Sequence, residues 1–447
     1  MRKRRRSMSK ILVPVLALAL LAGPAASAVF AQAKEVFIPL LVYRTGPYAP
    51  SGIPIANGFV DYFTLINERD GGINGVKLAW EECETQYDTK QGVECYERLK
   101  GKGPTGAVVV NPYSTGISYQ LIPKAPVDKT PILSMGYGMS ASSDGRWFPW
   151  VFNFPTNYWS QASAVIRYIG TQEGGLDKLK GKKIVHVHHN SPYGKEANPT
   201  LETLARQFGF ELTLLPVDHP GQEQKSTWLQ VRRINPDWIF MSGWGVMNQV
   251  AIKEAAAINF KMDHFIGNWW SANDSDVVPA ADGAKGYKGA TFHAPGTSFK
   301  VFQEVVKNVY DKGKGAGKKE EMGEPLYNRG IVNAMFAVEA IRTAMAQYGN
   351  KPMTGEQVRW GFEHLNLTDK RLEELGMKGF THPVKVSCED HESSGPILVQ
   401  QWDGKKWTVV SDWIQPMREV VRPKIEAAAV EEGKKLGYTM RDCSKEK

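Results

Sequence analysis

The sequence has little cysteine and, beyond its first 31 residues, lacks a hydrophobic run of the roughly 20 residues that a membrane helix needs. Its four cysteines lie at positions 83, 95, 388 and 443, without the Cys-x-x-Cys spacing of a zinc site. In an oxidising compartment an even number of cysteines indicates disulfides. We predict the pairs Cys83–Cys95 and Cys388–Cys443, although four cysteines allow three different pairings.

Motifs for catalysis and nucleotide binding are also missing. The sequence contains no Gly-x-Ser-x-Gly nucleophile turn, no cysteine beside a plausible base, and no GxGxxG or P-loop after the early strands. The Asn-Asp-Ser-Asp segment at residues 273–276 lacks the glycine and final glutamate of a calcium loop, which favours a polar loop or helix cap. We therefore predict that the protein is not an enzyme and needs no cofactor.

A group of histidines could suggest a metal site. His186, His188 and His189 lie in a predicted strand, on which residues 186 and 188 share a face and residue 189 points the other way. No acidic cluster is adjacent in the sequence, so we favour packing over metal binding and predict no metal site.

The first 31 residues have the pattern of a secretory signal peptide. Six basic residues precede an apolar run at residues 11–22, and we predict cleavage after Ala31 in preference to Ala28. The segment carries no acidic residue, so its removal lowers the net charge from +8 to +2. A nearly balanced charge does not indicate a nucleic-acid partner. The export signal, by the general or the twin-arginine route, predicts a periplasmic location.

Strand-like and helix-like segments then alternate in two series. The first has predicted strands at residues 35–43, 76–81, 107–110 and 131–134 and helices at residues 55–66 and 90–100. The second has strands at residues 183–188, 211–215, 238–241 and 264–267 and helices at residues 160–171, 195–208, 226–234 and 246–258. The two series predict an α/β fold with two doubly wound parallel-sheet lobes.

The last third of the chain breaks this alternation. We predict a long helix at residues 328–348, antiparallel strands at 383–387 and 397–402 with a hairpin turn at Asp403-Gly404, and a charged helix at 417–436. In parallel sheets, ligands bind beyond the carboxyl ends of the strands. The loops of interest therefore begin at Thr45, Asn111, Met135, His189, Ser242 and Asn268.

Several short motifs together carry a family resemblance. They are Thr-Gly-Pro at 45–47, Gly-Gly-Ile-Asn-Gly at 71–75, Asn-Pro-Tyr-Ser-Thr at 111–115, His-Asn-Ser-Pro-Tyr-Gly at 189–194 and Asn-Pro-Asp at 235–237. Their order and spacing resemble the type I periplasmic binding proteins of the leucine/isoleucine/valine-binding family. The resemblance extends over about residues 34–413.

The resemblance implies two lobes joined by a three-segment hinge, with crossings near Pro155, Thr291 and Gly379. Lobe 1 would then comprise residues 32–155 and 292–378, and lobe 2 residues 156–291 and 379–413, followed by a C-terminal extension at 414–447. It also implies that the lobes close around a small ligand. The loaded monomer would dock on the membrane permease subunits of an ABC importer.

Family members bind the carboxylate of their ligand through a serine at a helix start and a following Gly-Ala-Thr segment. The resemblance places Ser114, with Thr115 beside it, at the first of these positions. The second position reads Gly136-Tyr137-Gly138 and lacks the threonine hydroxyl, for which Ser140 or Ser142 could substitute.

The positions that hold the ligand ammonium in amino-acid-binding members differ more. By the same resemblance, the acidic residues fall at Tyr158 and Trp269, which carry no charge. A buried ammonium without a carboxylate partner is unfavourable. The sequence therefore argues against an α-amino acid as the preferred ligand.

Aromatic residues are concentrated at the same loops, and Trp159 and Trp270 lie beside the acidic positions as well. Aromatic walls suit a planar or apolar ligand, and we predict a small apolar or aromatic carboxylate, or a related amide. The alternative is that each ring only packs the lobes together. The predicted ligand-binding residues are Tyr48, Tyr113, Ser114, Thr115, Tyr137, Gly138, Tyr158, Tyr193, Trp244 and Trp269.

Two other functions stay open at this stage. Branched-chain amino acids become the expected ligand if the alignment at Tyr158 and Trp269 is shifted by a few residues. A sensor that presents its ligand to a membrane receptor would use the same lobes.

Overall fold

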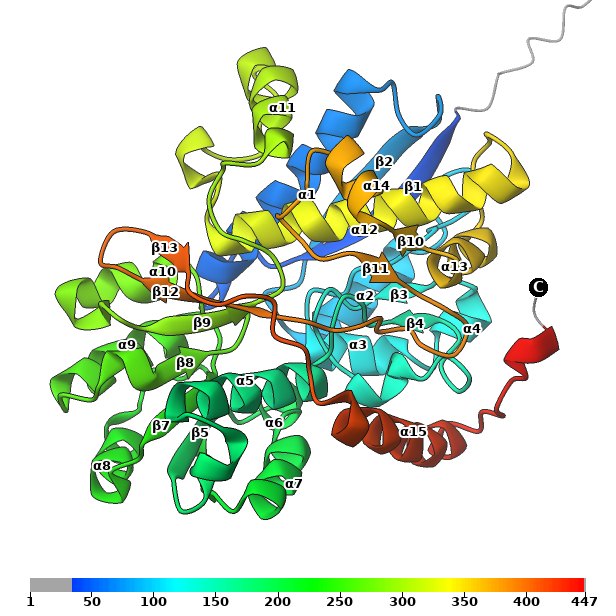
Figure 1. Cartoon of the computed structure of the whole chain (residues 1–447). Coiled ribbons are helices and arrows are strands. Elements are labelled where there is room, and N and C mark those ends of the chain that lie inside the picture. Colours follow the sequence, from blue (N-terminus) through cyan, green and yellow to red (C-terminus); the bar gives the residue numbers. More distant parts are fainter. Residues whose placement is uncertain (1–33, 446–447) are drawn as a thin grey trace, which may run out of the picture. The chain divides into compact units, whose positions relative to one another are not determined.

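The computed structural model describes residues 34–445 (Figure 1). The predicted signal peptide and its cleavage position lie outside the described residues. None of the helices within residues 34–445 combines the length and the hydrophobicity that a membrane span requires.

The first part of the chain begins with a parallel strand pair. β1 (Glu35–Val42) is buried over residues 36–42, as expected for an apolar strand in a parallel sheet. It pairs in parallel with β2 (Lys77–Glu84), and α1 (Ala49–Arg69) connects the two strands. The strand and helix predicted here are confirmed.

A second pair consists of β3 (Ile132–Leu133) and β4 (Val151–Phe152), which also run parallel. The strand predicted at residues 107–110 is wrong. This segment lies between two other segments in space and forms only isolated β-bridges with each of them. It therefore makes no continuous series of strand hydrogen bonds.

A seven-stranded sheet forms from later residues, in the order β13-β12-β9-β8-β7-β5-β6 (Figure 1). The strands from β5 to β9 run parallel, and β12 runs antiparallel to both β9 and β13. The predicted α/β class and the hairpin at Asp403-Gly404 are thus confirmed. The strands are β5 (Lys183–His189), β6 (Glu211–Val217), β7 (Trp238–Ser242), β8 (Phe265–Gly267), β9 (Lys288–Thr291), β12 (Leu398–Trp402) and β13 (Trp407–Val409).

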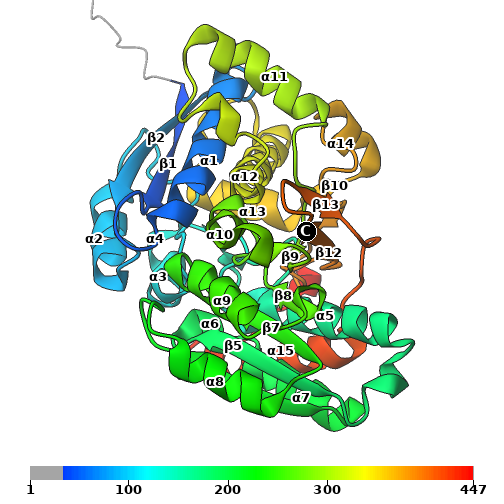
Figure 2. The same ribbon diagram turned by 90° about the vertical axis from the view of Figure 1, so that its left-hand side faces the viewer.

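Helices cover both faces of this sheet (Figure 2). Side chains alternate between the faces, so Ile184 packs with α5 (Tyr158–Glu173) and α7 (Asn198–Phe208). Its neighbour Val185 packs on the other face with residues of α8 (Lys225–Ile234) and α9 (Val246–Ala257).

The helix predicted at residues 195–208 is confirmed as α7, which begins three residues later, at Asn198. Residue 195 instead ends a separate short helix, α6 (Pro192–Lys195). Pro199 lies at the start of α7, where proline is tolerated, whereas within one long helix its ring would clash with the preceding turn.

The chain then returns to the first part of the structure. α12 (Pro325–Tyr348) packs along α1, and α11 (Lys300–Asn308) also contacts α1. The α1–α12 contact is close because Gly58 and Gly330 lack side chains. A Cβ atom on Gly330 would lie only 2.2 Å from the Ile55 carbonyl oxygen.

Several short elements complete the fold. Asn273 and Asp276 form a capping box at the start of α10 (Asp274–Val277), as the sequence predicted for this polar segment. β10 (Asn366–Leu367) pairs antiparallel with β11 (Val384–Lys385). The other short helices are α2 (Thr89–Leu99), α3 (Thr115–Leu121), α4 (Ala125–Asp128), α10 (Asp274–Val277), α13 (Gly355–Glu363) and α14 (Asp369–Glu374).

Segments near the predicted hinge crossings lie side by side. The Thr156 hydroxyl donates a hydrogen bond to the Gly395 carbonyl at 2.9 Å, and the Ala294 amide donates to the Phe380 carbonyl at 2.8 Å. The division of the chain into lobes at these crossings stays a prediction.

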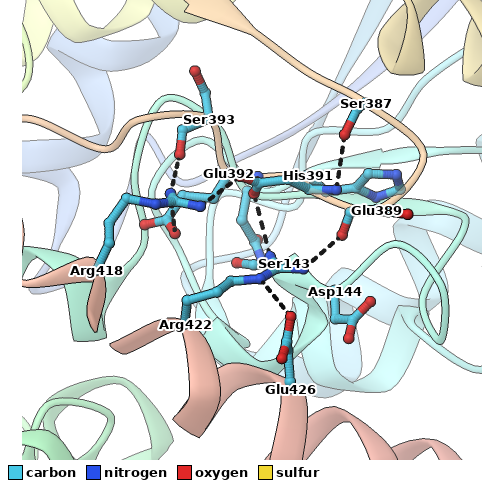
Figure 3. Close-up of polar contacts among 12 residues, drawn as sticks. Ser143, Asp144, Ser387, Glu389, His391, Glu392, Ser393, Arg418, Arg422 and Glu426 are labelled. Atoms are coloured by element: carbon cyan, nitrogen blue, oxygen red, sulfur yellow. Dashed lines mark hydrogen bonds and ion pairs between the residues drawn. The ribbon is translucent and has the colours of Figure 1, made fainter. Parts of the chain in front are cut away.

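The C-terminal helix α15 (Arg418–Lys435) packs on α5 and on the 3₁₀ turn at Ser140–Ser143. Figure 3 shows its basic residues turned toward the segment around residue 390: Arg418 lies 2.7 Å and Arg422 3.4 Å from carboxylate oxygens of Asp390. The disulfide Cys388–Cys443 joins the segment after α15 to the segment around residue 390, and Cys83–Cys95 joins β2 to α2. Both predicted disulfides are present.

Candidate ligand-binding site

Loops that follow strands of the two-stranded sheets and of the seven-stranded sheet bring their aromatic side chains into one buried cluster, which we call the ring cluster. At its centre Tyr137 stacks on Trp270, with 4.2 Å between ring centroids. Tyr137 comes from the loop after β3, and Trp270 from the loop after β8. The Tyr137 hydroxyl shares a hydrogen bond of 3.0 Å with the hydroxyl of Tyr43.

A second stack in the ring cluster joins Tyr158, the first residue of α5, to Trp269, with 5.2 Å between centroids. The Trp270 indole N–H donates to the Tyr158 hydroxyl at 2.8 Å, and the Trp269 indole N–H donates to the Gly136 carbonyl at 2.9 Å. Thr115 lies at the edge of this stack, where its hydroxyl accepts a hydrogen bond from the Gly138 amide at 3.2 Å.

Tyr193 and Trp244 extend the ring cluster on the side of the seven-stranded sheet. The Tyr193 hydroxyl donates to the Gly243 carbonyl at 2.8 Å and lies 3.0 Å from the side-chain oxygen of Asn268. Trp244 meets the edge of Trp270 at a centroid distance of 5.1 Å.

Tyr48 caps the start of α1 at another edge of the ring cluster. Its hydroxyl is hydrogen-bonded to the imidazoles of His189, at 3.0 Å, and His219. Its ring lies 4.9 Å from that of Tyr87, which in turn contacts Tyr43.

The remaining predicted residues are Tyr113 and Ser114, at the start of α3. The Ser114 hydroxyl accepts from the Ile117 amide and also contacts the hydroxyl of Tyr87. Tyr113 meets Tyr43 edge to face at 6.5 Å. The structure therefore brings all of the predicted ligand-binding residues together; whether each contacts a ligand stays a prediction.

Several hydrogen-bond donors of the ring cluster are buried without a partner among the described residues. They are the Tyr113 hydroxyl, the Trp244 indole nitrogen and the Asn268 amide nitrogen. Leaving a buried donor unpaired typically costs about 1–3 kcal/mol, which a ligand acceptor could recover.

The serines suggested as substitutes for the missing threonine are used elsewhere. The Ser140 hydroxyl donates to Glu196 at 2.9 Å, and the Ser142 hydroxyl donates to the Met139 carbonyl at 2.6 Å. Trp159, although next to Tyr158, packs instead beneath α15, where its indole donates to the Glu196 carbonyl.

The tyrosines at the centre of the ring cluster are neutral, and a buried arginine contacts the cluster. Burial raises the pKa of Tyr43, Tyr137 and Tyr158 well above the usual value of 10, so their hydroxyls keep their protons. Burial also lowers the pKa of His189 to about 4, so this imidazole is neutral.

The arginine is Arg329 of α12, which the sequence analysis did not single out. Its side chain is fully buried, and the guanidinium lies 4.1 Å from the ring centre of Phe292 and 4.9 Å from that of Trp270. Burial lowers its pKa to about 9, which leaves it charged at neutral pH. The signal available in the sequence was the position of this arginine, directly before the mostly apolar stretch of residues 330–341.

The histidines considered as metal ligands are occupied by protein partners. His186 hydrogen-bonds to the side chains of Asn198 and Ser242, at 2.7 and 2.9 Å, and stacks on His188 as expected for one strand face. Burial lowers the pKa of His186 to about 3. Within residues 34–445, no group of three or more His, Cys, Asp or Glu side chains is arranged to hold a metal ion.

Comparisons with known proteins agree with this architecture. The family model described as periplasmic binding protein matches residues 35–406. A structure from the Pseudomonas fluorescens group, titled an ABC transporter permease, is 43% identical with a TM-score of 0.86, and the match covers 92% of this chain and 99% of that one. No curated protein sequence matches the chain at a significant level.

More distant structures share the fold. A branched-chain amino acid ABC transporter protein from Thermus thermophilus with bound valine is 19% identical, with a TM-score of 0.72 over 88% of this chain and 99% of that one. A solute-binding protein from R. palustris in complex with benzoate is 15% identical, with a TM-score of 0.67 over 86% and 97%. The chain therefore belongs to the periplasmic binding protein family and has its type I fold.

Proposed function

We propose that the protein is the substrate-binding component of an ABC importer and that it captures a small apolar or aromatic carboxylate, or a related amide, between two lobes. Lobe 1 consists of residues 32–155 and 292–378, and lobe 2 of residues 156–291 and 379–413. The ligand is released unchanged to the permease. The family match and the predicted export signal support a location outside the cytoplasm.

The ring cluster is the observation that carries this proposal. Tyr137, Trp269 and Trp270 come from loops that follow strands, which is where ligands of open α/β sheets bind, and the proposed lobes place Tyr137 opposite the two tryptophans. A flat ligand inserted between Tyr137 and Trp270 replaces one stacking contact with two. The unpaired donors of Tyr113, Trp244 and Asn268 supply the polar contacts that orient it.

Branched-chain amino acids are the main competing ligands, because the Thermus thermophilus structure contains valine. In the ring cluster, however, the predicted ammonium positions are Tyr158 and Trp269, and both are committed to stacking and hydrogen bonds. The absence of a carboxylate at either position disfavours an ammonium group.

Thermal unfolding tests the proposal directly. The chain without residues 1–31 is heated with a panel of aromatic and aliphatic carboxylates and their amides, and with leucine, isoleucine and valine. A ligand at 100 times its dissociation constant stabilises a protein by about 2.7 kcal/mol, a readable shift in Tm. Stabilisation by apolar acids but not by the amino acids is expected. Stabilisation by the amino acids alone would refute the ligand assignment.

A further inference from the structure

Arg329 is fixed at the hinge side of the ring cluster by neutral partners. Its Nε donates a hydrogen bond to the Nε2 atom of His293 at 2.9 Å, and its Nη2 lies 3.4 Å from the Thr291 hydroxyl. Burial and the adjacent guanidinium both lower the pKa of His293, so this imidazole is neutral and accepts the hydrogen bond. Neither partner carries a negative charge.

The guanidinium contacts two aromatic rings. It lies 4.1 Å from the ring centre of Phe292 and 4.9 Å from that of Trp270, and Trp270 in turn stacks on Tyr137. Ring faces attract a cation, but a desolvated cation–π contact contributes only about 2 kcal/mol. The positive charge therefore lies one ring away from the site where we place the ligand.

No carboxylate among residues 34–445 forms an ion pair with Arg329, and its Nη1 atom is buried without a hydrogen-bond partner. Burying an uncompensated charge costs several kcal/mol even after the protein relaxes. Other buried groups do have a partner of opposite charge; Glu363, for example, lies 3.2 Å from Arg359. Arg329 lacks such a counter-charge among the described residues.

We infer that Arg329 is the counter-charge for an anionic group of the ligand and is the residue that makes this site select carboxylates over neutral amides. The inference rests on the proposed function, because it assigns a ligand class to the same ring cluster. It narrows that proposal from acids or amides to acids. When the lobes separate, Trp270 moves with the seven-stranded sheet, and the ligand gains access to the guanidinium.

Matched pairs of ligands test this inference. Binding of benzoate against benzamide, and of 4-methylpentanoate against 4-methylpentanamide, is measured by calorimetry with the wild type and with Arg329→Met. The matched control is Arg342→Met, which removes a cation from the same helix; Arg342 is partly exposed and paired with Glu339 at 3.1 Å.

The wild type is expected to bind at least one acid about tenfold or more tightly than its amide. Arg329→Met should weaken acid binding by about 100-fold and leave amide binding unchanged, because a buried charge pair loses one partner. Arg342→Met should retain the preference, and Arg329→Lys, which keeps the charge, should retain part of it.

Two results would overturn the inference while leaving the ligand site intact: equal binding of acid and amide by the wild type, or an undiminished preference in Arg329→Met. Binding of neither member of either pair would instead count against the proposed ligand class. The Tm without ligand separately tests whether Arg329 has only a structural role. An uncompensated charge predicts that Arg329→Met unfolds at or above the wild-type temperature, whereas a purely structural arginine predicts a loss of several degrees.

Discussion

At the scale of single residues, the structure places most of its charges in pairs and leaves a few buried acids without adequate compensation. Glu392 is buried at the hinge, where its carboxylate accepts a hydrogen bond from the Asn157 amide at 3.2 Å and lies 3.6 Å from Arg418. Burial, reinforced by the nearby charge of Asp390, raises the pKa of Glu392 to about 7. The folded protein therefore favours the protonated acid.

This shift predicts how stability depends on pH. Because the folded pKa lies above the unfolded value, the stabilisation from Glu392 is complete below about pH 4.5 and is lost as the pH rises through 7. Between pH 5 and pH 8, Glu392→Gln should gain stability relative to the wild type, by up to about 3 kcal/mol. Urea unfolding at several pH values measures the difference.

The neighbouring Glu389 provides the control, since it is exposed. Glu389→Gln should differ from the wild type by a constant amount across the same range. A constant difference for Glu392→Gln as well would show that this acid has no raised pKa.

At the scale of elements, the contact between α1 and α12 joins two segments that lie far apart in the sequence. It depends on glycine, because a Cβ atom on Gly330 would approach the Ile55 carbonyl oxygen to 2.2 Å and the Phe59 amide nitrogen to 2.6 Å. Backbone atoms of a packed helix cannot move aside as a flexible side chain would. The helices must separate to accept even one methyl group.

Gly330→Ala should therefore lower the free energy of unfolding by about 1–3 kcal/mol, even though alanine favours helix formation. Chemical denaturation measures the change. Gly101→Ala, at a site where a Cβ atom meets nothing within 4 Å, should have little effect. Equal effects of the two substitutions would mean that the close approach of α1 and α12 does not limit packing.

At the scale of the whole molecule, the sequence predicted the α/β class, most strands and helices of the two alternating series, and the loops in which the aromatic residues gather. Hydrophobic periodicity and turn residues indicate strands, helices and loops locally. The motifs at 45–47 and 111–115 match the pattern of one family. Tyr43, Tyr87 and Arg329 could not be assigned in this way. Their places in the site depend on contacts between segments far apart in the chain, such as the 4.9 Å approach of Arg329 to Trp270.

The differences in secondary structure have two separate causes. Residues 107–110 have the composition of a strand, but strand formation depends on neighbours that only the tertiary structure supplies. The break between α6 and α7 follows from a local feature, Pro199, and could have been predicted from it.

The central claim is that a small apolar acid binds between the lobes, and a crystal structure of the complex tests it most directly. The chain is crystallised with the carboxylate that stabilises it most. We predict ligand density between Tyr137 and Trp270, in contact with residues of both lobes, with the carboxylate directed toward Arg329. Density at any other surface, with the Tyr137–Trp270 stack still closed, would contradict the account.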